Sequence, residues 1–232
     1  MDAVILAAGL GTRLRPYTLQ TPKPLLPVRG RPILDWTLGA LPRSVDRVVV
    51  VVNYLAEQVE AYLRGQTHRA QWEVVRQDVP RGTGDALRSC RAKLRSDHFL
   101  VLNGDDLYGA ADLARLAACP AGLLVQTVPE PRKFGIAFLN ADGSLEKLVE
   151  KPDLDGPQLA NTGAYVFPHT VFDYELKPSP RGEFEITDYV SYQARQGRVE
   201  VVTAAFWLPI GTVEVWQAAQ EKDLDAVMTA EK

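Results

Sequence analysis

The chain has 232 residues, of which 46% are hydrophobic and 24% charged, a composition that excludes a disordered chain and suits one large domain or two small ones sharing a core. The net charge of −3 argues against a general nucleic-acid or membrane-binding surface, so an anion site requires a local cluster of basic side chains. The two cysteines have no CxxC spacing, and no apolar run suits a signal peptide or a membrane span, so we expect a reduced, cytoplasmic protein.

The first half of the sequence alternates apolar runs with helical patterns. Short, fully apolar runs predict strands buried on both faces, and apolar residues spaced three or four apart predict helices. In chain order, the predicted elements are a strand at 3–6, a helix at 33–41, a strand at 47–52, helices at 56–63 and 83–94, and a strand at 99–102. This alternation, with short connections, predicts right-handed crossovers and a mostly parallel sheet.

The second half contains shorter strand candidates separated by proline and glycine, which favours antiparallel pairing. Residues 140–144, NADGS, predict a hairpin turn through Asp142 and Gly143. The predicted elements are strands at 122–128, 134–139, 145–150 and 159–167, a helix at 185–196 that ends before Gly197, a strand at 199–207 and a closing helix at 213–228. We therefore predict one α/β domain with a parallel part and a mixed part that join near Asp106.

A glycine-rich, basic stretch follows the first predicted strand. Residues 6–16 read LAAGLGTRLRP, and backbone amides near Gly9 and Gly11 can approach phosphate oxygens closely. The stretch is neither a P-loop nor the dinucleotide fingerprint, because Leu14 stands where the third glycine belongs. Arg13 and Arg15 would supply positive charge, although a strand-to-helix turn with solvated arginines stays open.

Two further single residues are candidates for the same site. Lys23, in TPKPLLPV at 21–28, lies between Pro22 and Pro24, so a stiff backbone can deliver its ammonium to a phosphate; a solvated surface lysine is the alternative. Asp105 follows the strand predicted at 99–102 and suits Mg²⁺, which prefers carboxylate and phosphate oxygens. A solvated loop aspartate or a helix cap is the alternative for Asp105.

These stretches resemble the signature of sugar-1-phosphate nucleotidylyltransferases, which join a nucleoside triphosphate to a sugar 1-phosphate and release pyrophosphate. Further matching segments cover nearly the whole chain in the expected order: RQDVPRGTGDAL (76–87), LNGDD (102–106), FGI (134–136), EKP (150–152), NTGAYVF (161–167) and RGEFEITD (181–188). The resemblance implies a Rossmann-like three-layer α/β sandwich with a mostly parallel central sheet and a mixed or antiparallel sugar-binding part. It implies one domain, 1–232, with a nucleotide-binding half at 1–106 and a sugar-phosphate-binding half at 107–232.

The resemblance also implies roles for individual residues. Arg13, Lys23 and Asp105 would be catalytic, with Mg²⁺ as the cofactor on Asp105. Gln77 would read the base, and GTGDA at 82–86 is most similar to a uridine-binding loop, which favours UTP, with dTTP next; a surface residue that caps a turn is the alternative for Gln77. The implied nucleotide-binding residues are Ala8, Gly9, Gly11, Thr12, Gln77, Gly82 and Thr83.

On the sugar side, the resemblance implies contacts by Gly135, Glu150, Lys151, Asn161 and Arg181. Glu150 and Asn161 would meet sugar hydroxyls, and Lys151 and Arg181 would meet phosphate. The alternative for Glu150 and Lys151 is an exposed charge pair that contributes little.

The implied reaction is an in-line attack of a sugar-phosphate oxygen on the α-phosphorus, driven by positioning and charge neutralisation. It needs no covalent intermediate and no general base, so His68, His98 and His169 are expected to have no catalytic role. The expected partners are small-molecule substrates, without nucleic acid or membrane, and the sequence leaves a homo-oligomer and the identity of the sugar open.

The segment at 207–212, WLPIGT, departs from the family pattern, because many relatives carry a second metal-ligating aspartate where Pro209 stands. Mg²⁺ would then rest on Asp105, phosphates and water, or take Asp106 or Asp188 as a substitute ligand. The departure keeps open a nucleotide-binding regulatory protein with weak catalysis. A nucleotidyltransferase for a non-sugar phosphate such as phosphocholine is a further alternative, and without hexapeptide repeats no acyltransferase function is expected.

Overall fold

The structure is a computed structural model that describes residues 1–65, 67 and 70–228, so the predicted non-catalytic His68 lies outside the described residues. Within the described residues, nine strands form one central sheet, along which the order is β10-β9-β11-β6-β1-β4-β5, with β8 pairing to β11 and β12. No helix in these ranges is both long and apolar enough to span a membrane.

The parallel part of the sheet contains the three strands that the sequence predicts at 3–6, 47–52 and 99–102, and one further strand. It consists of β1 (Asp2–Leu6), β4 (Arg47–Val52), β6 (His98–Asn103) and β5 (Gln71–Arg76). β1 lies between β4 and β6 and is parallel to both, and its residues are buried throughout. β5 was not predicted, because this edge strand is only partly buried and lacks a continuous apolar run.

The second part of the sheet is mostly antiparallel. It contains β8 (Gly122–Val128), β9 (Gly135–Leu139), β10 (Leu145–Glu150), β11 (Gln158–Pro168) and β12 (Glu200–Thr203). β11 pairs antiparallel with β6 and so joins the two parts, whereas β12 runs parallel to β8. The predicted turn at 140–144 connects β9 and β10, and Asn140 N–H donates to the Ser144 carbonyl at 2.9 Å.

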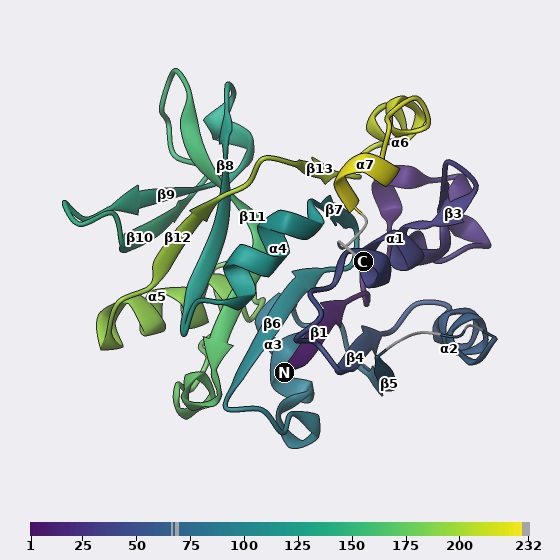
Figure 1. Ribbon diagram of the computed structural model, residues 1–232, viewed down its shortest axis with the longest axis horizontal. Helices are drawn as coiled ribbons and strands as arrows, with labels where there is room; N and C mark the ends of the chain where they lie inside the picture. Colours follow the sequence, from purple (N-terminus) through teal and green to yellow (C-terminus); the bar gives the residue numbers. More distant parts are fainter. Residues whose placement is uncertain (66, 68–69, 229–232) are drawn as a thin grey trace.

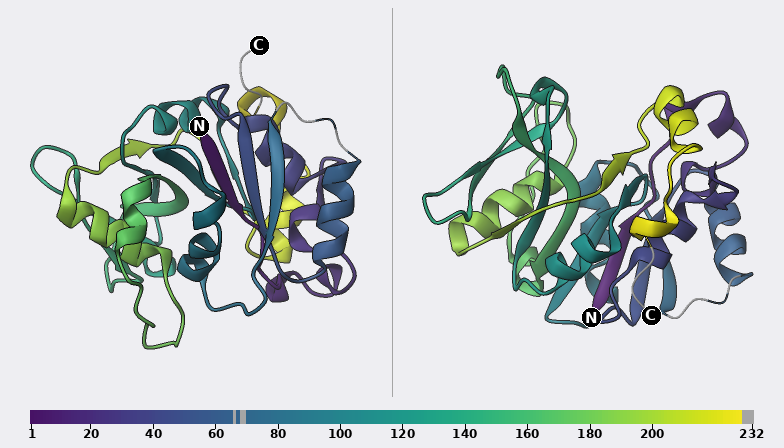
Figure 2. Two further views of the ribbon diagram at one scale, coloured as in Figure 1. Left: turned by 90° about the horizontal axis from the view of Figure 1, so that it is seen from below. Right: turned by 45° about the horizontal axis from the view of Figure 1, so that its top comes forward.

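Helices cover both faces of the sheet and complete a three-layer α/β sandwich (Figures 1 and 2). One core lies under α1 (Ile33–Ala40), α2 (Ala56–Arg64), α4 (Ala110–Ala117) and α7 (Asp225–Met228). The other lies under α3 (Thr83–Ser89) and α5 (Ile186–Gln196), which ends before Gly197 as predicted. Alternate residues of β1, Ala3 and Val4, enter opposite cores, so the predicted fold class is confirmed.

The strand predicted at 199–207 is confirmed only over β12, because the chain leaves the central sheet after Thr203. The buried Asp112 carboxylate accepts hydrogen bonds from the backbone amides of Ala205 and Phe206, both at 2.9 Å. This contact redirects the chain into β13 (Trp207–Pro209), which pairs with β7 (Asp106–Tyr108) in a separate two-stranded sheet. The sequence did not predict β7 or α4.

Two helix predictions are also corrected. The helix at 83–94 ends at Ser89 and gives way to a 3-10 turn, Arg91–Lys93. The closing helix at 213–228 breaks into α6 (Val213–Ala219) and α7, because the turn between them buries Leu224 completely and brings α7 against α1 and α4. The C-terminal helices therefore lie beside the N-terminal loops, as Figure 1 shows.

Candidate active site

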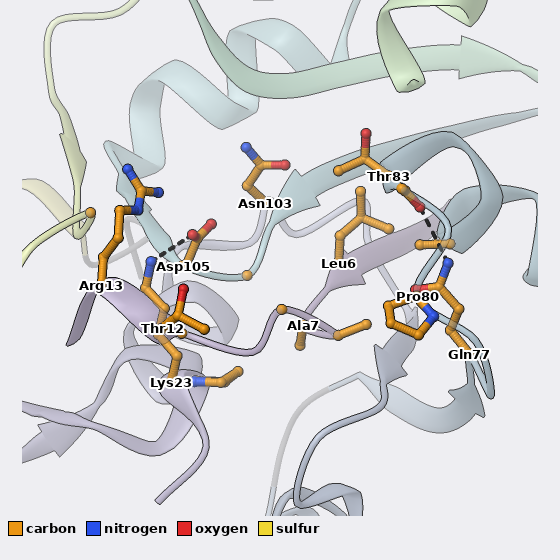
Figure 3. A pocket seen from close by; sticks show the side chains of 18 of the residues that line it. Leu6, Ala7, Thr12, Arg13, Lys23, Gln77, Pro80, Thr83, Asn103 and Asp105 are labelled. Atoms are coloured by element: carbon orange, nitrogen blue, oxygen red, sulfur yellow. Dashed lines mark hydrogen bonds and ion pairs between the residues drawn. The ribbon is translucent and has the colours of Figure 1, made fainter. Parts of the chain in front are cut away.

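A cleft of about 450 Å³ opens at the carboxyl ends of the parallel strands, where ligands bind in open α/β sheets. Loops after β1, β5 and β6 line it, together with the chain before α5 and the chain after β13 (Figure 3). Most of the predicted site residues line this one cleft: Ala8, Gly9, Gly11, Thr12, Arg13, Lys23, Gln77, Gly82, Thr83, Asp105 and Arg181.

The glycine-rich loop needs glycine at position 11. Its φ of +61° is left-handed, and a Cβ there would lie 2.9 Å from the Thr18 methyl carbon. The Thr18 hydroxyl donates to the Gly11 carbonyl at 2.7 Å, and the turn Thr12–Leu14 is anchored by buried Leu14. Arg13 is exposed and, among the described residues, has no ion pair, so its charge is available to an anion.

Lys23 is buried, with 6% of its surface exposed, which rules out the alternative of a solvated lysine. It begins a 3-10 turn, Lys23–Leu25, after an extended Pro22 and with Pro24 in the first turn, so the prolines do stiffen its backbone. Its Nζ lies 2.6 Å from Oδ2 of Asp105, whose side chain is 41% exposed (Figure 3). One edge of the cleft therefore presents a paired ammonium and carboxylate.

Asp105 is the carboxylate that faces the cleft, whereas its neighbour Asp106 is buried beneath it. The Trp207 indole N–H donates to Asp106 Oδ2 at 3.2 Å, and burial, with the adjacent Asp105 charge, raises the pKa of Asp106 well above its usual range. Pro209 pairs with Asp106 across β7 and β13, and Ile210 N–H donates to the Asp105 carbonyl at 3.2 Å.

The proposed metal ligands can be tested by this geometry. Asp105 offers hard, partly solvated carboxylate oxygens beside the cleft, which suits one protein ligand of Mg²⁺. Asp106 and Asp188, the suggested substitutes, do not line the cleft. Over residues 1–65, 67 and 70–228, no group of three or more His, Cys, Asp or Glu side chains comes together as a metal site, so substrate phosphates and water would have to complete the coordination.

Gln77 is also buried, with 5% of its surface exposed, so the alternative of a surface turn cap is wrong. Its Nε2 donates to the Gly82 carbonyl at 3.2 Å and to Asp85 Oδ2 at 3.0 Å. Gly82 has a φ of +103°, and a Cβ there would lie 2.5 Å from the Phe184 carbonyl oxygen. The loop after β5 is thus packed tightly against the chain before α5.

Three hydrogen bonds fasten these two segments together. Gly84 N–H donates to the Phe184 carbonyl at 2.8 Å, and Phe184 N–H donates to the Arg81 carbonyl at 2.7 Å. Ile186 N–H donates to the Thr83 hydroxyl at 3.1 Å. Arg181 reaches the same cleft, but its guanidinium lies 2.7 Å from Glu185 and 3.6 Å from Glu183, so its charge is shared with two carboxylates.

The remaining predicted sugar-side residues lie outside the cleft, on β9, β10 and β11 and their ends. Gly135 pairs with Glu150, and a Cβ at Gly135 would lie 3.1 Å from Glu150 Oε2 and 3.9 Å from Asn161 Cβ. Lys151 Nζ lies 3.7 Å from Glu150 Oε1, and both side chains are exposed. These residues therefore form a second group, in which Glu150 and Lys151 have the geometry of a surface charge pair.

Within that second group, the Asn161 side chain is held at both ends. Its Nδ2 donates to the Tyr165 hydroxyl at 2.8 Å, and its Oδ1 accepts from the Gly163 amide at 2.9 Å. These contacts fix the orientation of the amide.

Sequence reasoning missed Asn103, which lines the cleft at the end of β6 and projects into it beside Asp105 (Figure 3). Gly163, on the neighbouring strand β11, has a φ of +81°, and a Cβ there would overlap the Asn103 side chain. The sequence feature that could have identified Asn103 is its position directly before Gly104 and Asp105, at the carboxyl end of a predicted strand. The expected non-catalytic histidines His98 and His169 lie at the end of these strands opposite the cleft, at the start of β6 and just after β11.

Known proteins resemble this chain over most of its length. The chain is 34% identical over 224 residues to a glucose-1-phosphate thymidylyltransferase of Streptomyces griseus, covering 92% of this chain and 63% of that protein. It is 32% identical over 214 residues to the bifunctional protein GlmU of Methanocaldococcus jannaschii, covering 91% of this chain and 51% of that protein. The chain thus spans only half to two thirds of the length of these relatives.

Solved structures match over nearly their full length. A Bacillus anthracis protein assigned as a glucose-1-phosphate thymidylyltransferase, solved with sucrose, has a TM-score of 0.84 and 29% identity, covering 95% of this chain and 94% of that one. A UDP-glucose pyrophosphorylase solved with UDP-glucose has a TM-score of 0.82 and 23% identity, covering 94% and 96%, which shows a common fold. A family model described as nucleotidyl transferase matches residues 2–226, and the chain therefore belongs to the nucleotidyl transferase family.

Proposed function

We propose that the protein transfers a nucleotidyl group from a nucleoside triphosphate, UTP first and dTTP next, to a sugar 1-phosphate and releases pyrophosphate. The observation that carries this proposal is one cleft that combines a glycine-rich loop, the Lys23–Asp105 pair and the buried amide of Gln77. The first and second halves of the chain, 1–106 and 107–232, would bind the nucleotide and the sugar phosphate respectively.

The chemistry follows from bringing two anions together. A phosphate oxygen of the sugar 1-phosphate attacks the α-phosphorus in line, and pyrophosphate leaves from the opposite side. The backbone at Ala8, Gly9, Gly11 and Thr12 would hold the triphosphate, and Arg13 would neutralise the departing charge. Mg²⁺, when bound through Asp105, would neutralise phosphate oxygens.

Lys23 would do its work near the reacting phosphorus. Its buried ammonium lies between the glycine-rich loop and Asp105. A phosphate oxygen would have to displace the Asp105 carboxylate from this ammonium or share the ammonium with it. Gln77, Gly82 and Thr83 would hold the base. A phosphate nucleophile is already ionised at neutral pH, so no side chain needs to remove a proton.

For the acceptor, we propose that Gly135, Glu150, Lys151 and Asn161 bind the sugar and its phosphate, with Arg181 meeting phosphate at the cleft. The exposed Glu150 carboxylate would accept hydrogen bonds from sugar hydroxyls, and the exposed Lys151 ammonium would meet the phosphate. The free thiols of Cys90 and Cys119 are buried, which supports a cytoplasmic location.

The test is pyrophosphate release with Mg²⁺ across UTP, dTTP, CTP, GTP and ATP, each paired with glucose, N-acetylglucosamine and mannose 1-phosphates. We expect turnover that is lost in Lys23→Ala and in Asp105→Ala, and retained in the control Lys177→Ala, whose lysine is exposed and away from the cleft. If no pair of substrates releases pyrophosphate while nucleotide binding is retained, the proposal is contradicted. A nucleotide-binding regulatory protein, the alternative that Pro209 leaves open, would then be favoured. Glu150→Ala should impair a sugar enzyme and spare one that acts on phosphocholine.

A further inference from the structure

The Gln77 side chain has only one orientation that its surroundings accept. The two groups that face its amide nitrogen are the Gly82 carbonyl, at 3.2 Å, and Asp85 Oδ2, at 3.0 Å. A carbonyl and a carboxylate can only accept hydrogen bonds, so both hydrogens of the amide nitrogen are used. The reversed amide would place its oxygen against two other oxygens.

Asp85 is a fixed carboxylate. It is 6% exposed, lies in the first turn of α3, and its Oδ1 accepts from Arg88 at 2.5 Å and lies 3.4 Å from the Arg81 guanidinium. Burial alone would raise the pKa of Asp85, but hydrogen bonds from Gln77 and Arg88 outweigh it, so the pKa lies below its ordinary value of 3.8. Asp85 therefore stays an acceptor at neutral pH.

The other end of the Gln77 amide remains available. Among the residues the structure describes, no donor reaches Oε1, although Gln77 is buried and lines the cleft. A buried acceptor without a partner costs free energy, so a ligand that supplies a donor at this place gains affinity. Asp85 itself does not line the cleft and would not touch the ligand.

We infer that Asp85 is a positioning residue that makes Gln77 a fixed hydrogen-bond acceptor and thereby selects the pyrimidine base. This inference rests on the proposed function only for the identity of the ligand as a nucleotide. Uracil and thymine carry a hydrogen on ring nitrogen N3, which can donate to Gln77 Oε1. Cytosine presents a lone pair at N3, which faces an acceptor unfavourably.

The experiment measures UTP and CTP binding by calorimetry, with Mg²⁺ present, in the full chain and in Asp85→Asn. Asparagine keeps the size of the side chain but can also donate, so only the Gly82 carbonyl still opposes the reversed Gln77 amide. We expect the ratio of UTP to CTP affinity to fall by up to roughly tenfold, the upper end of what one neutral hydrogen bond contributes.

Asp112→Asn is the matched control. Asp112 is also buried in the first turn of a helix and also accepts from an arginine three residues on, Arg115, at 2.6 Å, but it lies away from the cleft. We expect its substitution to leave the affinity ratio unchanged. An equal loss for both nucleotides in Asp85→Asn, or no change in either, would overturn the inference.

A second measurement uses only the unsubstituted protein and covers the case in which Asp85→Asn does not fold. 3-Methyl-UTP lacks the N3 hydrogen, whereas 5-methyl-UTP keeps it. We expect the first analogue to lose roughly tenfold or more in affinity relative to the second; equal affinities would overturn the inference. Nucleotide selection without any sugar transfer would contradict the proposed function and leave this inference standing.

Discussion

The ammonium of Lys23 lies 2.6 Å from Oδ2 of Asp105, although one residue comes from the loop after β1 and the other from the end of β6. In a complex with a nucleotide and a metal ion, the Lys23 ammonium would bind a phosphate oxygen and the Asp105 carboxylate would bind the metal. Each group would thus exchange its present partner for a ligand of the same charge. Lys23 is nearly buried, while the Asp105 side chain stays 41% exposed, so the carboxylate can turn toward solvent or a cation and the ammonium cannot.

Replacing Lys23 with methionine keeps the aliphatic stem and removes the charge. We expect kcat to fall by roughly 10²- to 10³-fold, as when one preorganised donor to developing charge is lost. The free energy of unfolding should change by only about 1 kcal/mol, because water can solvate the exposed side of Asp105. Steady-state kinetics and urea unfolding measure the two effects, and Lys133→Met, which removes an exposed pair with Glu130, is the control. A small kinetic effect would contradict a phosphate role for Lys23.

The sequence predicted three of the four parallel strands, the glycine-rich loop and half of the residues that line the cleft, because these depend on local patterns at the ends of buried strands. It did not predict contacts set by distant segments. The Asp112 carboxylate lifts residues 205 and 206 off the sheet, and α3 brings Asp85 under Gln77. The first contact joins residues far apart in the sequence, and the second depends on how α3 packs against the loop after β5. Hydrophobic periodicity encodes neither of these.

The contact between Gly163 and Asn103 predicts unequal costs for two glycine substitutions. Gly163 and Gly143 have similar left-handed φ values, +81° and +78°, but a Cβ at Gly163 would overlap Asn103, whereas one at Gly143 meets open space. We expect Gly143→Ala to cost about 1–2 kcal/mol of unfolding free energy from the backbone alone. Gly163→Ala should cost clearly more and raise KM for the nucleotide, since Asn103 lines the cleft and must move. Equal costs in urea unfolding, with KM unchanged, would show that Asn103 does not depend on this glycine.

The lowered pKa of Asp85 predicts how stability depends on pH. Its carboxylate is favoured in the folded state by Gln77 and Arg88, despite its burial, so the folded pKa lies below the ordinary 3.8. This contribution is complete above the unfolded pKa and is lost as pH falls through the folded pKa. The difference in unfolding free energy between the unsubstituted protein and Asp85→Asn should therefore shrink between about pH 5 and about pH 2. If the difference in unfolding free energy between the two proteins stays constant over this pH range, the ionised state of Asp85 is contradicted.

Trp216 on α6 contacts the chain on both sides of Lys23. Its ring centroid lies 4.7 Å from that of Tyr17, and its indole N–H donates to the Pro27 carbonyl at 2.8 Å. Trp216→Phe keeps the ring contact and loses the hydrogen bond.

Because that bond contributes about 0.5–1.5 kcal/mol, we expect KM for the nucleotide to rise by about 2- to 10-fold in Trp216→Phe, with kcat less affected. Trp216→Ala should raise KM further, since the ring contact with Tyr17 is lost as well. Trp72→Phe, on the edge strand β5, is the control for removing an indole elsewhere. If KM is unchanged in Trp216→Ala while the melting temperature falls, α6 stabilises the fold without positioning Lys23.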